Sequence, residues 1–89
     1  MELDEAWAKK FMEKLDKSHV WPSLYTFKFI VKAGREDDVR QLFPMHTNTS
    51  RSSANGNYTS LTFQMMMPSP EAIVSVYRRA STIEGIIAL

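Results

Sequence analysis

The chain has 89 residues, of which 44% are hydrophobic and 24% charged, and its formal net charge is +1. This length allows one hydrophobic core, and the composition is typical of a soluble globular domain, not of a disordered or membrane-spanning chain. The small net charge excludes the long-range field of a strongly basic nucleic-acid-binding protein. The absence of cysteine and of a basic, apolar signal segment predicts a cytoplasmic protein without disulfides.

Residues 4–17 have the pattern of an amphipathic helix with Asp4 as its N-cap. Apolar side chains recur every four residues along it: Leu3, Trp7, Phe11 and Leu15. This stripe must be buried on the chain's own sheet, on a second subunit or on another protein, so Trp7 and Phe11 are candidate partner-interface residues. The acidic residues of the helix argue against a membrane surface. Because Pro22 separates this helix from the rest of the chain, we divide the sequence into an arm (1–20) and a domain (21–89).

The next segment, 24–33, is predicted to be a strand, because aromatic and β-branched residues alternate with polar ones. Its core-facing residues are predicted to be Tyr25, Phe27, Phe29 and Val31, which leaves Thr26, Lys28 and Ile30 on the other face. Gly34 then gives a turn, and 35–43 is predicted to be a short helix that Pro44 ends.

A polar strand over 45–53 and a strand over 58–67 are predicted to form a hairpin around Asn55 and Gly56, a pair that favours a two-residue turn. Alternation directs three residues of the second strand to the core: Leu61, Phe63 and Met65. The polar first strand fits an edge position, where it discourages association between sheets.

Ser69, Pro70 and Glu71 form a strong helix start, and a helix is predicted over 70–81, followed by a strand over 84–89. After the arm, the predicted order is therefore βαββαβ. This order predicts an α+β, ferredoxin-like fold: a four-stranded antiparallel sheet with two helices on one face, preceded by an N-terminal amphipathic helix. Right-handed crossovers place the first and third strands in the centre.

Three stretches carry a family resemblance: 22–28 at the start of the first strand, 53–61 at the hairpin, and the terminal strand. In these the chain resembles the YbeD-like family of small bacterial proteins of unknown function, which belongs by fold with the ACT-like regulatory domains. The resemblance covers about 22–89 and implies a free-standing domain without a catalytic residue. In ACT-like domains, amino acids typically bind near the loop after the first strand, often at a dimer interface. Ala33, Gly34 and Arg35 hold that place here and are candidate ligand-binding residues.

No motif of a nucleophile, nucleotide loop or metal site occurs in the sequence. His19 and His46 stand alone in loops, and the acidic run 36–38 suits the first turn of a helix. We therefore expect no enzymatic activity, no cofactor and no metal.

The open sheet face remains as an alternative site. Lys28, Lys32, Arg51 and Tyr58 are candidate residues for weak nucleic-acid binding there, although the paired stacking aromatics of RNA-recognition motifs are missing. The sequence thus favours a regulatory or interaction domain that binds a small metabolite, such as an amino acid, or a protein partner. A homodimer is an expected assembly, and nucleic acid is the second choice of ligand.

Overall fold

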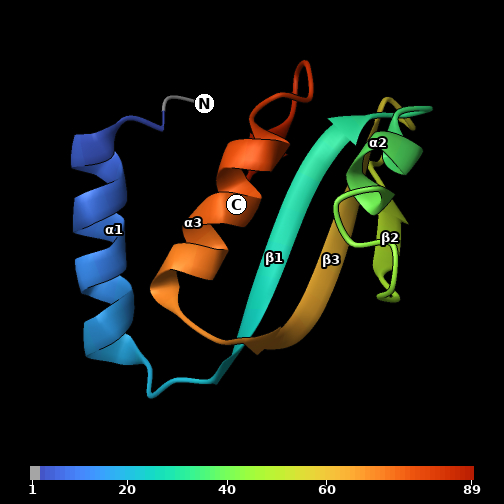
Figure 1. Cartoon of the computed structure of the whole chain (residues 1–89). Helices are drawn as coiled ribbons and strands as arrows, with labels where there is room; N and C mark the ends of the chain where they lie inside the picture. The colour runs from blue at the N-terminus through green and yellow to red at the C-terminus, as the bar shows by residue number, and fades with distance from the viewer. Residues whose placement is uncertain (1–2) are drawn as a thin grey trace.

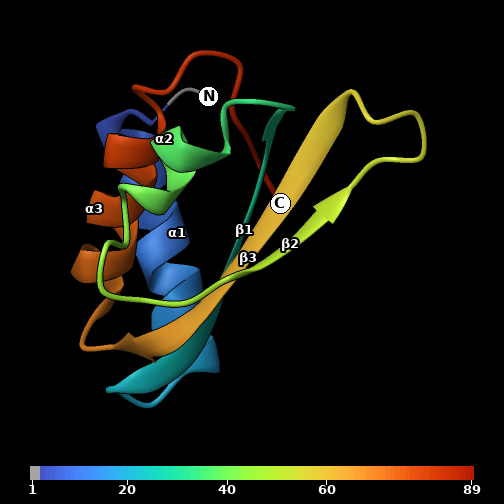
Figure 2. The same cartoon turned by 90° about the vertical axis from the view of Figure 1, so that its right-hand side faces the viewer.

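The computed structural model describes residues 3–89. Within these residues the elements are α1 (Glu5–Ser18), β1 (Ser23–Lys32), α2 (Glu36–Arg40), β2 (Thr49–Ser52), β3 (Tyr58–Met67), α3 (Pro70–Ala80) and β4 (Ile87–Ala88) (Figure 1). The four strands form one antiparallel sheet in the order β2-β3-β1-β4, so the first and third strands are central as expected. The three helices of residues 3–89 lie on one side of the sheet (Figure 2). The predicted α+β class is confirmed.

The long central strands form the core because their apolar residues alternate. Phe27 lies opposite Phe63 and Phe29 opposite Leu61 in the β1–β3 register, and all four side chains are fully buried beneath the helices. The core face predicted for both strands is confirmed. Burying each of these side chains stabilises the fold by roughly 1.5–3 kcal/mol relative to leaving it exposed.

Helix α3 begins where its sequence predicts. The Ser69 hydroxyl accepts a hydrogen bond from the Ala72 amide at 3.2 Å, and Pro70 occupies the first turn. Its buried stripe faces the sheet and includes the predicted residues: Ile73, Val76, Tyr77 and Ala80. Arg78 and Arg79 lie in the last turn, where the helix dipole favours cations. The helix therefore closes the core from the C-terminal half of the chain.

The arm helix α1 packs on α3, at the side of the helical layer (Figure 1). Asp4 caps it as predicted, accepting a hydrogen bond from the Trp7 amide at 2.7 Å. The rings of Trp7 and Phe11 stack with 5.0 Å between their centroids. Each lies edge-to-face with the Tyr77 ring, at centroid distances of 6.4 Å for Trp7 and 5.6 Å for Phe11. The apolar stripe thus packs within the chain, against α3, although Trp7 and Phe11 stay partly exposed. It leaves the far side of the sheet uncovered.

Three predicted elements are shorter than expected. The helix over 35–43 ends at Arg40, and the amides of Leu42 and Phe43 bond three residues back in turns, because the chain must leave the helix before Pro44. Phe43 is still buried in the core. The strand over 45–53 starts only at Thr49, and Met45 is 89% exposed in the preceding turn. The last strand begins at Ile87 because turns centred on Ile83 and Gly85 occupy 81–86.

The two-residue hairpin turn was a wrong prediction. The amide of Ser53 bonds the carbonyl of Tyr58 at 2.8 Å, which closes a loop of four residues, 54–57. Gly56 alone among these adopts a positive φ, at 74°, and Asn55 does not. Instead, the Asn55 side-chain oxygen accepts hydrogen bonds from the Asn57 amide at 3.1 Å and the Ser53 hydroxyl at 2.9 Å. This side-chain bonding, common for Asn in turns, stabilises the longer loop.

Candidate functional site

The sheet face that points away from the helices, here called the open face, is the principal candidate site. A row of paired residues crosses all four strands on this face: Arg51 opposite Ser60, Ser60 opposite Ile30, and Ile30 opposite Ile87. The sheet twists around this row and forms a hollow of about 550 Å³. Because β1 and β3 are central, the hollow has a floor of rigid, paired backbone.

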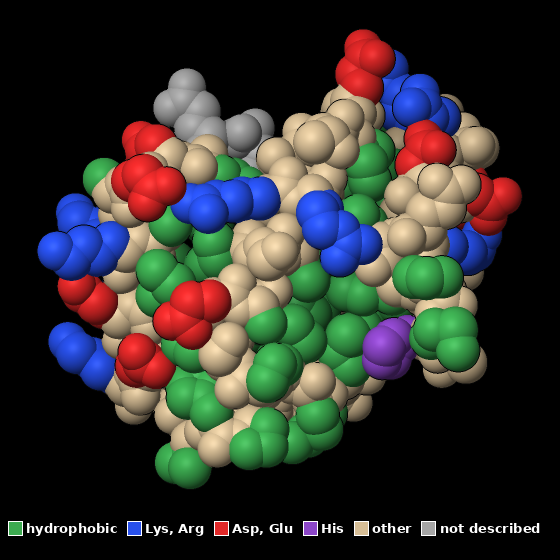
Figure 3. All heavy atoms as spheres, in the orientation of Figure 1, with side chains coloured by type: hydrophobic (Ala, Val, Ile, Leu, Met, Phe, Trp, Pro, Cys, Tyr) green, Lys and Arg blue, Asp and Glu red, His purple; other side chains and the backbone are tan. Residues whose placement is uncertain are grey.

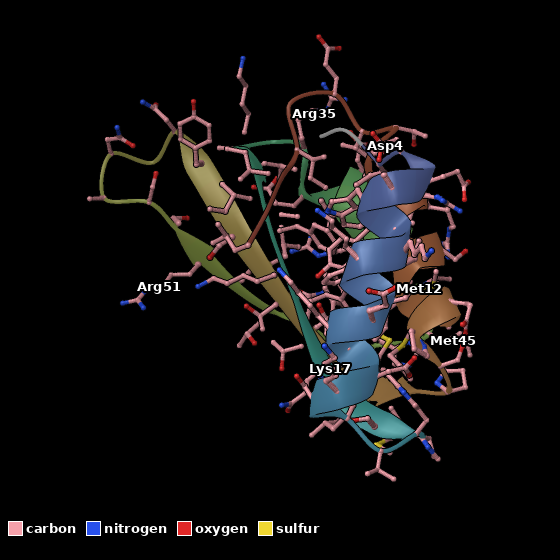
Figure 4. All side chains as sticks on the ribbon, turned by 90° about the vertical axis from the view of Figure 1, so that its left-hand side faces the viewer. Asp4, Met12, Lys17, Arg35, Met45 and Arg51 are labelled. Carbon is pink, nitrogen blue, oxygen red and sulfur yellow. The ribbon has the colours of Figure 1, made fainter. Side chains whose placement is uncertain are left out.

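Three of the four predicted sheet-face residues line this hollow: Lys28, Arg51 and Tyr58. Figure 4 shows Arg51 extending from β2 on the side of the sheet away from α1. The fourth, Lys32, lies opposite Tyr58 in the β1–β3 register and belongs to the same face. The structure therefore brings together residues that are up to 30 positions apart in the sequence (Lys28 and Tyr58).

The charges of the open face all have one sign. The strands contain the cations Lys28, Lys32 and Arg51, and no Asp or Glu. Each of these cations is exposed, and none forms an ion pair with a carboxylate among residues 3–89. On the helical face, by contrast, Asp and Glu side chains are interspersed with Lys and Arg (Figure 3). The open face is thus a local cationic surface on a chain of nearly zero net charge.

Apolar side chains form one part of the lining of the hollow, beside Ser52, Ser53, Ser60 and the two cations. Ile87 is 50% exposed, Leu89 is 65% exposed and Tyr58 is 42% exposed, and all three side chains line the hollow with the partly buried Ile30. The Leu89 amide bonds the Lys28 carbonyl at 2.9 Å, which holds the last residue beside β1. Exposed apolar side chains that gather around a hollow are typical of a binding surface.

Ile87 and Leu89 were missed as site residues in the sequence. A strand of two residues has too few positions for its alternation to show which face each side chain takes. A signal was present nonetheless, because residues 86–89 (IIAL) are all apolar and a short strand turns only some of its side chains toward the core. Ile30 was placed on this face by parity alone, and the structure agrees.

The Gly34 loop, the other predicted ligand site, is engaged by its own chain. The Gly34 amide donates to Glu36 Oε1 at 2.8 Å, and the Arg35 guanidinium Nε donates to Asp38 Oδ2 at 2.7 Å. The hydrogen bond and charge of Asp38 raise the pKa of the Arg35 guanidinium. Ala33 and Arg35 line different hollows, and Figure 4 shows Arg35 at the end of the molecule, away from Arg51. The two groups that would meet a ligand carboxylate already have internal partners, so nothing in this geometry favours the ligand prediction over a simple turn.

Glu36 also ties this loop to the core face of β3. The Thr59 hydroxyl donates to Glu36 Oε2 at 2.7 Å, and Thr59 is the buried polar residue of the described chain. This hydrogen bond, with those from the Glu36 and Gly34 amides, lowers the pKa of Glu36. The carboxylate therefore acts as a structural link between the loop, α2 and the sheet.

The aromatic side chains around Tyr77 pack against one another as part of the core. The hydroxyls of Tyr77 and Tyr25 are 2.9 Å apart and share a hydrogen bond. Burial, and then this hydrogen bond, raise the pKa of Tyr77 well above its ordinary value, so the hydroxyl stays neutral. The predicted interface residues Trp7 and Phe11 cover the cluster and remain partly exposed, which leaves the partner prediction for them in place.

The two histidines lie in separate surroundings. His19 Nδ1 is 2.7 Å from the Ser23 hydroxyl. The His46 and Phe43 rings lie edge-to-face with 6.4 Å between their centroids. Among residues 3–89, no three His, Asp or Glu side chains gather closely enough to hold a metal ion. No helix in the same part of the chain is both long and apolar enough to cross a bilayer.

These features define a small α+β domain whose most distinctive surface is the hollowed face of its sheet. The family model described as "Protein of unknown function (DUF493)" matches residues 16–89, so the chain belongs to this family. It is the YbeD family that the sequence resembles, and the prediction is confirmed. The match begins in the last turn of α1, so most of that helix lies outside it. Comparisons with curated proteins and with solved structures found no match.

Proposed function

We propose that this chain is a regulatory or interaction domain that acts by binding a partner on the open face of its sheet, without catalysing a reaction. The observation that carries the proposal is the grouping of Lys28, Arg51 and Tyr58 around an apolar hollow that the fold itself leaves uncovered. Three of the seven large apolar side chains that are exposed in the described chain line this hollow: Tyr58, Ile87 and Leu89. Exposed apolar side chains around a hollow favour an interaction site.

The proposed fold family is ferredoxin-like, with α1 added before the first strand. The element order after α1 and the central positions of β1 and β3 support this assignment. The departures are the five-residue α2 and the two-residue β4. The short β4 and the residue after it border the hollow with only Ile87 and Leu89, which favours access from solvent.

A homodimer, as we propose it, uses an edge of the sheet and not the open face. Strand β4 pairs with β1 only at Phe29 and Ile30, so the part of β1 before Lys28 has no strand beside it on that side in the described chain. An unpaired edge can add a strand from a second copy. We propose the cytoplasm as the place of action, since a chain without cysteines suits a reducing compartment.

Amide chemical shifts of the ¹⁵N-labelled chain test this proposal, because they report binding residue by residue. We expect one or more of three probe classes to shift the amides of Ile30, Ser60 and Ile87 in a saturable way: a panel of amino acids and other carboxylates, a mixed-sequence single-stranded RNA, and an acidic helical peptide. The amides of α1 serve as the internal control and should not move.

Two results would contradict the proposal. Shifts confined to Ala33, Gly34 and Arg35 would place the site in the loop after β1 and favour the metabolite prediction. No saturable shift from any of the three classes would show that the open face is an ordinary solvated surface.

A further inference from the structure

The separation of charge between the strands and the rest of the chain constrains what can bind the open face. Three of the eleven Lys and Arg residues lie in the strands, which contain no Asp or Glu. The rest of the sequence therefore has eight Lys and Arg residues and ten Asp and Glu residues. The open face is therefore cationic, and the rest of the chain carries a formal net charge of −2 (eight cations less ten acids). A second copy docked face to face would set its cations (Lys28, Lys32 and Arg51) against those of the first copy, and like charges across an interface repel each other. The occupant must instead carry carboxylates or phosphates.

The apolar residues distinguish between these two anions. Ile30, Ile87 and Leu89 are aliphatic, and Tyr58 is the single aromatic residue on the open face of the described strands. Proteins that bind single-stranded nucleic acids stack successive bases on several aromatic side chains, and here there is one. Aliphatic side chains are matched best by the aliphatic or aromatic side chains of a protein. The hollow thus fits an occupant with carboxylates around an apolar centre.

The backbone of the sheet determines the conformation of that occupant. At the centre of the open face, the peptide groups of β1 and β3 are already used in their ladder of paired residues. An extended peptide laid across this face would leave its own peptide groups unpaired against apolar side chains, which is costly. An α-helix satisfies its backbone internally and needs only side-chain contacts, as in the helix-in-groove mode of recognition.

We propose that the open face docks an acidic amphipathic α-helix of a partner protein. The apolar stripe of this helix lies on Ile30, Ile87 and Leu89, and carboxylates along its flanks meet Lys28 and Arg51. The proposal rests on the proposed function, because it assigns an occupant to the same face.

A labelled synthetic helix tests the proposal directly. The probe is an acetylated, fluorescein-labelled peptide of about five turns, with leucines at i, i+3, i+4 and i+7 spacing and glutamates elsewhere. A matched peptide of identical composition, rearranged so that no apolar stripe forms, is the control. Fluorescence anisotropy at low salt should show saturable binding of the first peptide and binding at least about tenfold weaker for the second.

Charge variants of the protein locate the contact. Lys28→Glu should weaken binding of the acidic peptide by about tenfold or more, because it reverses a charge at the edge of the hollow. Lys9→Glu makes the same change of net charge on the exposed surface of α1 and should alter the affinity by less than about twofold. Circular dichroism confirms that both variants are folded and that the amphipathic peptide is helical when bound.

Each remaining outcome overturns the proposal. Equal binding of the rearranged peptide, or equal weakening by Lys28→Glu and Lys9→Glu, would mean that net charge alone attracts the probe. Lys28-dependent binding of mixed-sequence RNA or of anionic lipid vesicles, with no binding of the peptide, would overturn the helix proposal and leave the open face as the binding surface. If none of these probes binds, the helix proposal fails, and the amide shifts of the ¹⁵N-labelled chain decide the proposed function separately.

Discussion

The two faces of the sheet differ in what the fold needs from them. On the face beneath the helices, Phe27, Phe29 and Phe63 are fully buried and make the core. On the open face, Ile30 and Ile87 lie opposite one another on β1 and β4, yet Ile87 remains half exposed. The first face explains why the chain folds. The second carries apolar side chains that stay exposed or partly exposed in the folded chain, which is typical of an interaction surface.

Neighbouring residues of β1 provide the sharpest test of this difference. Phe29→Ala should destabilise the protein by about 3–5 kcal/mol, because it opens a cavity in the core. Ile30→Thr, one residue further along, should cost less than about 1 kcal/mol, since it keeps a β-branched shape on a solvated face. Urea denaturation of both variants checks the pair. Similar losses for the two would show that the open face is covered and structural, contrary to this account.

A second prediction concerns the packing of α1 on α3 in the helical layer. Trp7→Ala should cost about 2 kcal/mol, because a partly buried aromatic loses its contacts with Phe11 and Tyr77. Thermal or chemical unfolding measures this cost, and Lys10→Ala, an exposed residue of the same helix, should change stability by less than about 0.5 kcal/mol. A negligible effect of Trp7→Ala would mean that α1 leaves α3 in solution, which would free Trp7 and Phe11 for a partner.

The smallest expected effect concerns the hydrogen bond from the buried Thr59 hydroxyl to Glu36. Glu36 has a lowered pKa in the folded chain because it accepts the hydrogen bond from Thr59, so the unfolded chain takes up its proton more readily. The stability from this contact is complete above the unfolded pKa of the carboxyl and is lost as the pH falls through the lower, folded pKa.

Denaturation curves between about pH 3 and pH 7 measure that dependence. Glu36→Gln and Thr59→Val should each reduce the loss of stability on the acid side, the first by removing the titrating group and the second by removing the donor. Asp37→Asn, which changes an exposed neighbour with a surface ion pair to Arg40, is the control and should leave most of this acid-side loss in place. If Glu36→Gln loses as much stability at low pH as the unsubstituted chain, the hydrogen bond between Glu36 and Thr59 does not form.

The sequence was most informative where an element is long. Ten residues of clear alternation placed both faces of β1 and β3 correctly, and Ser69 and Pro70 marked the start of α3. It was least informative where turns compete with regular structure. The side chain of Asn55 stabilises a four-residue loop that the Asn-Gly pair alone did not predict, and the turns before Ile87 shorten the last strand. Alternation cannot be read from two residues.

The candidate site could likewise be predicted only where its residues lie on long strands. Lys28, Lys32 and Tyr58 could be placed on the open face because they lie on long strands. The hollow itself could not be predicted, because it depends on the twist of the sheet and on the return of Leu89 beside Lys28. The amphipathic stripe of the arm showed that α1 needs a surface, but only the structure shows that this surface is α3 and that the open face stays bare.

The affinity of the Ile30→Thr/Ile87→Thr double variant for the acidic amphipathic peptide tests the central claim most directly. We predict that this variant stays folded, loses no more than about 2 kcal/mol of stability, and binds the peptide at least about tenfold more weakly than the unsubstituted chain. Unchanged affinity in the folded double variant would contradict the claim that the apolar residues of the open face exist for binding.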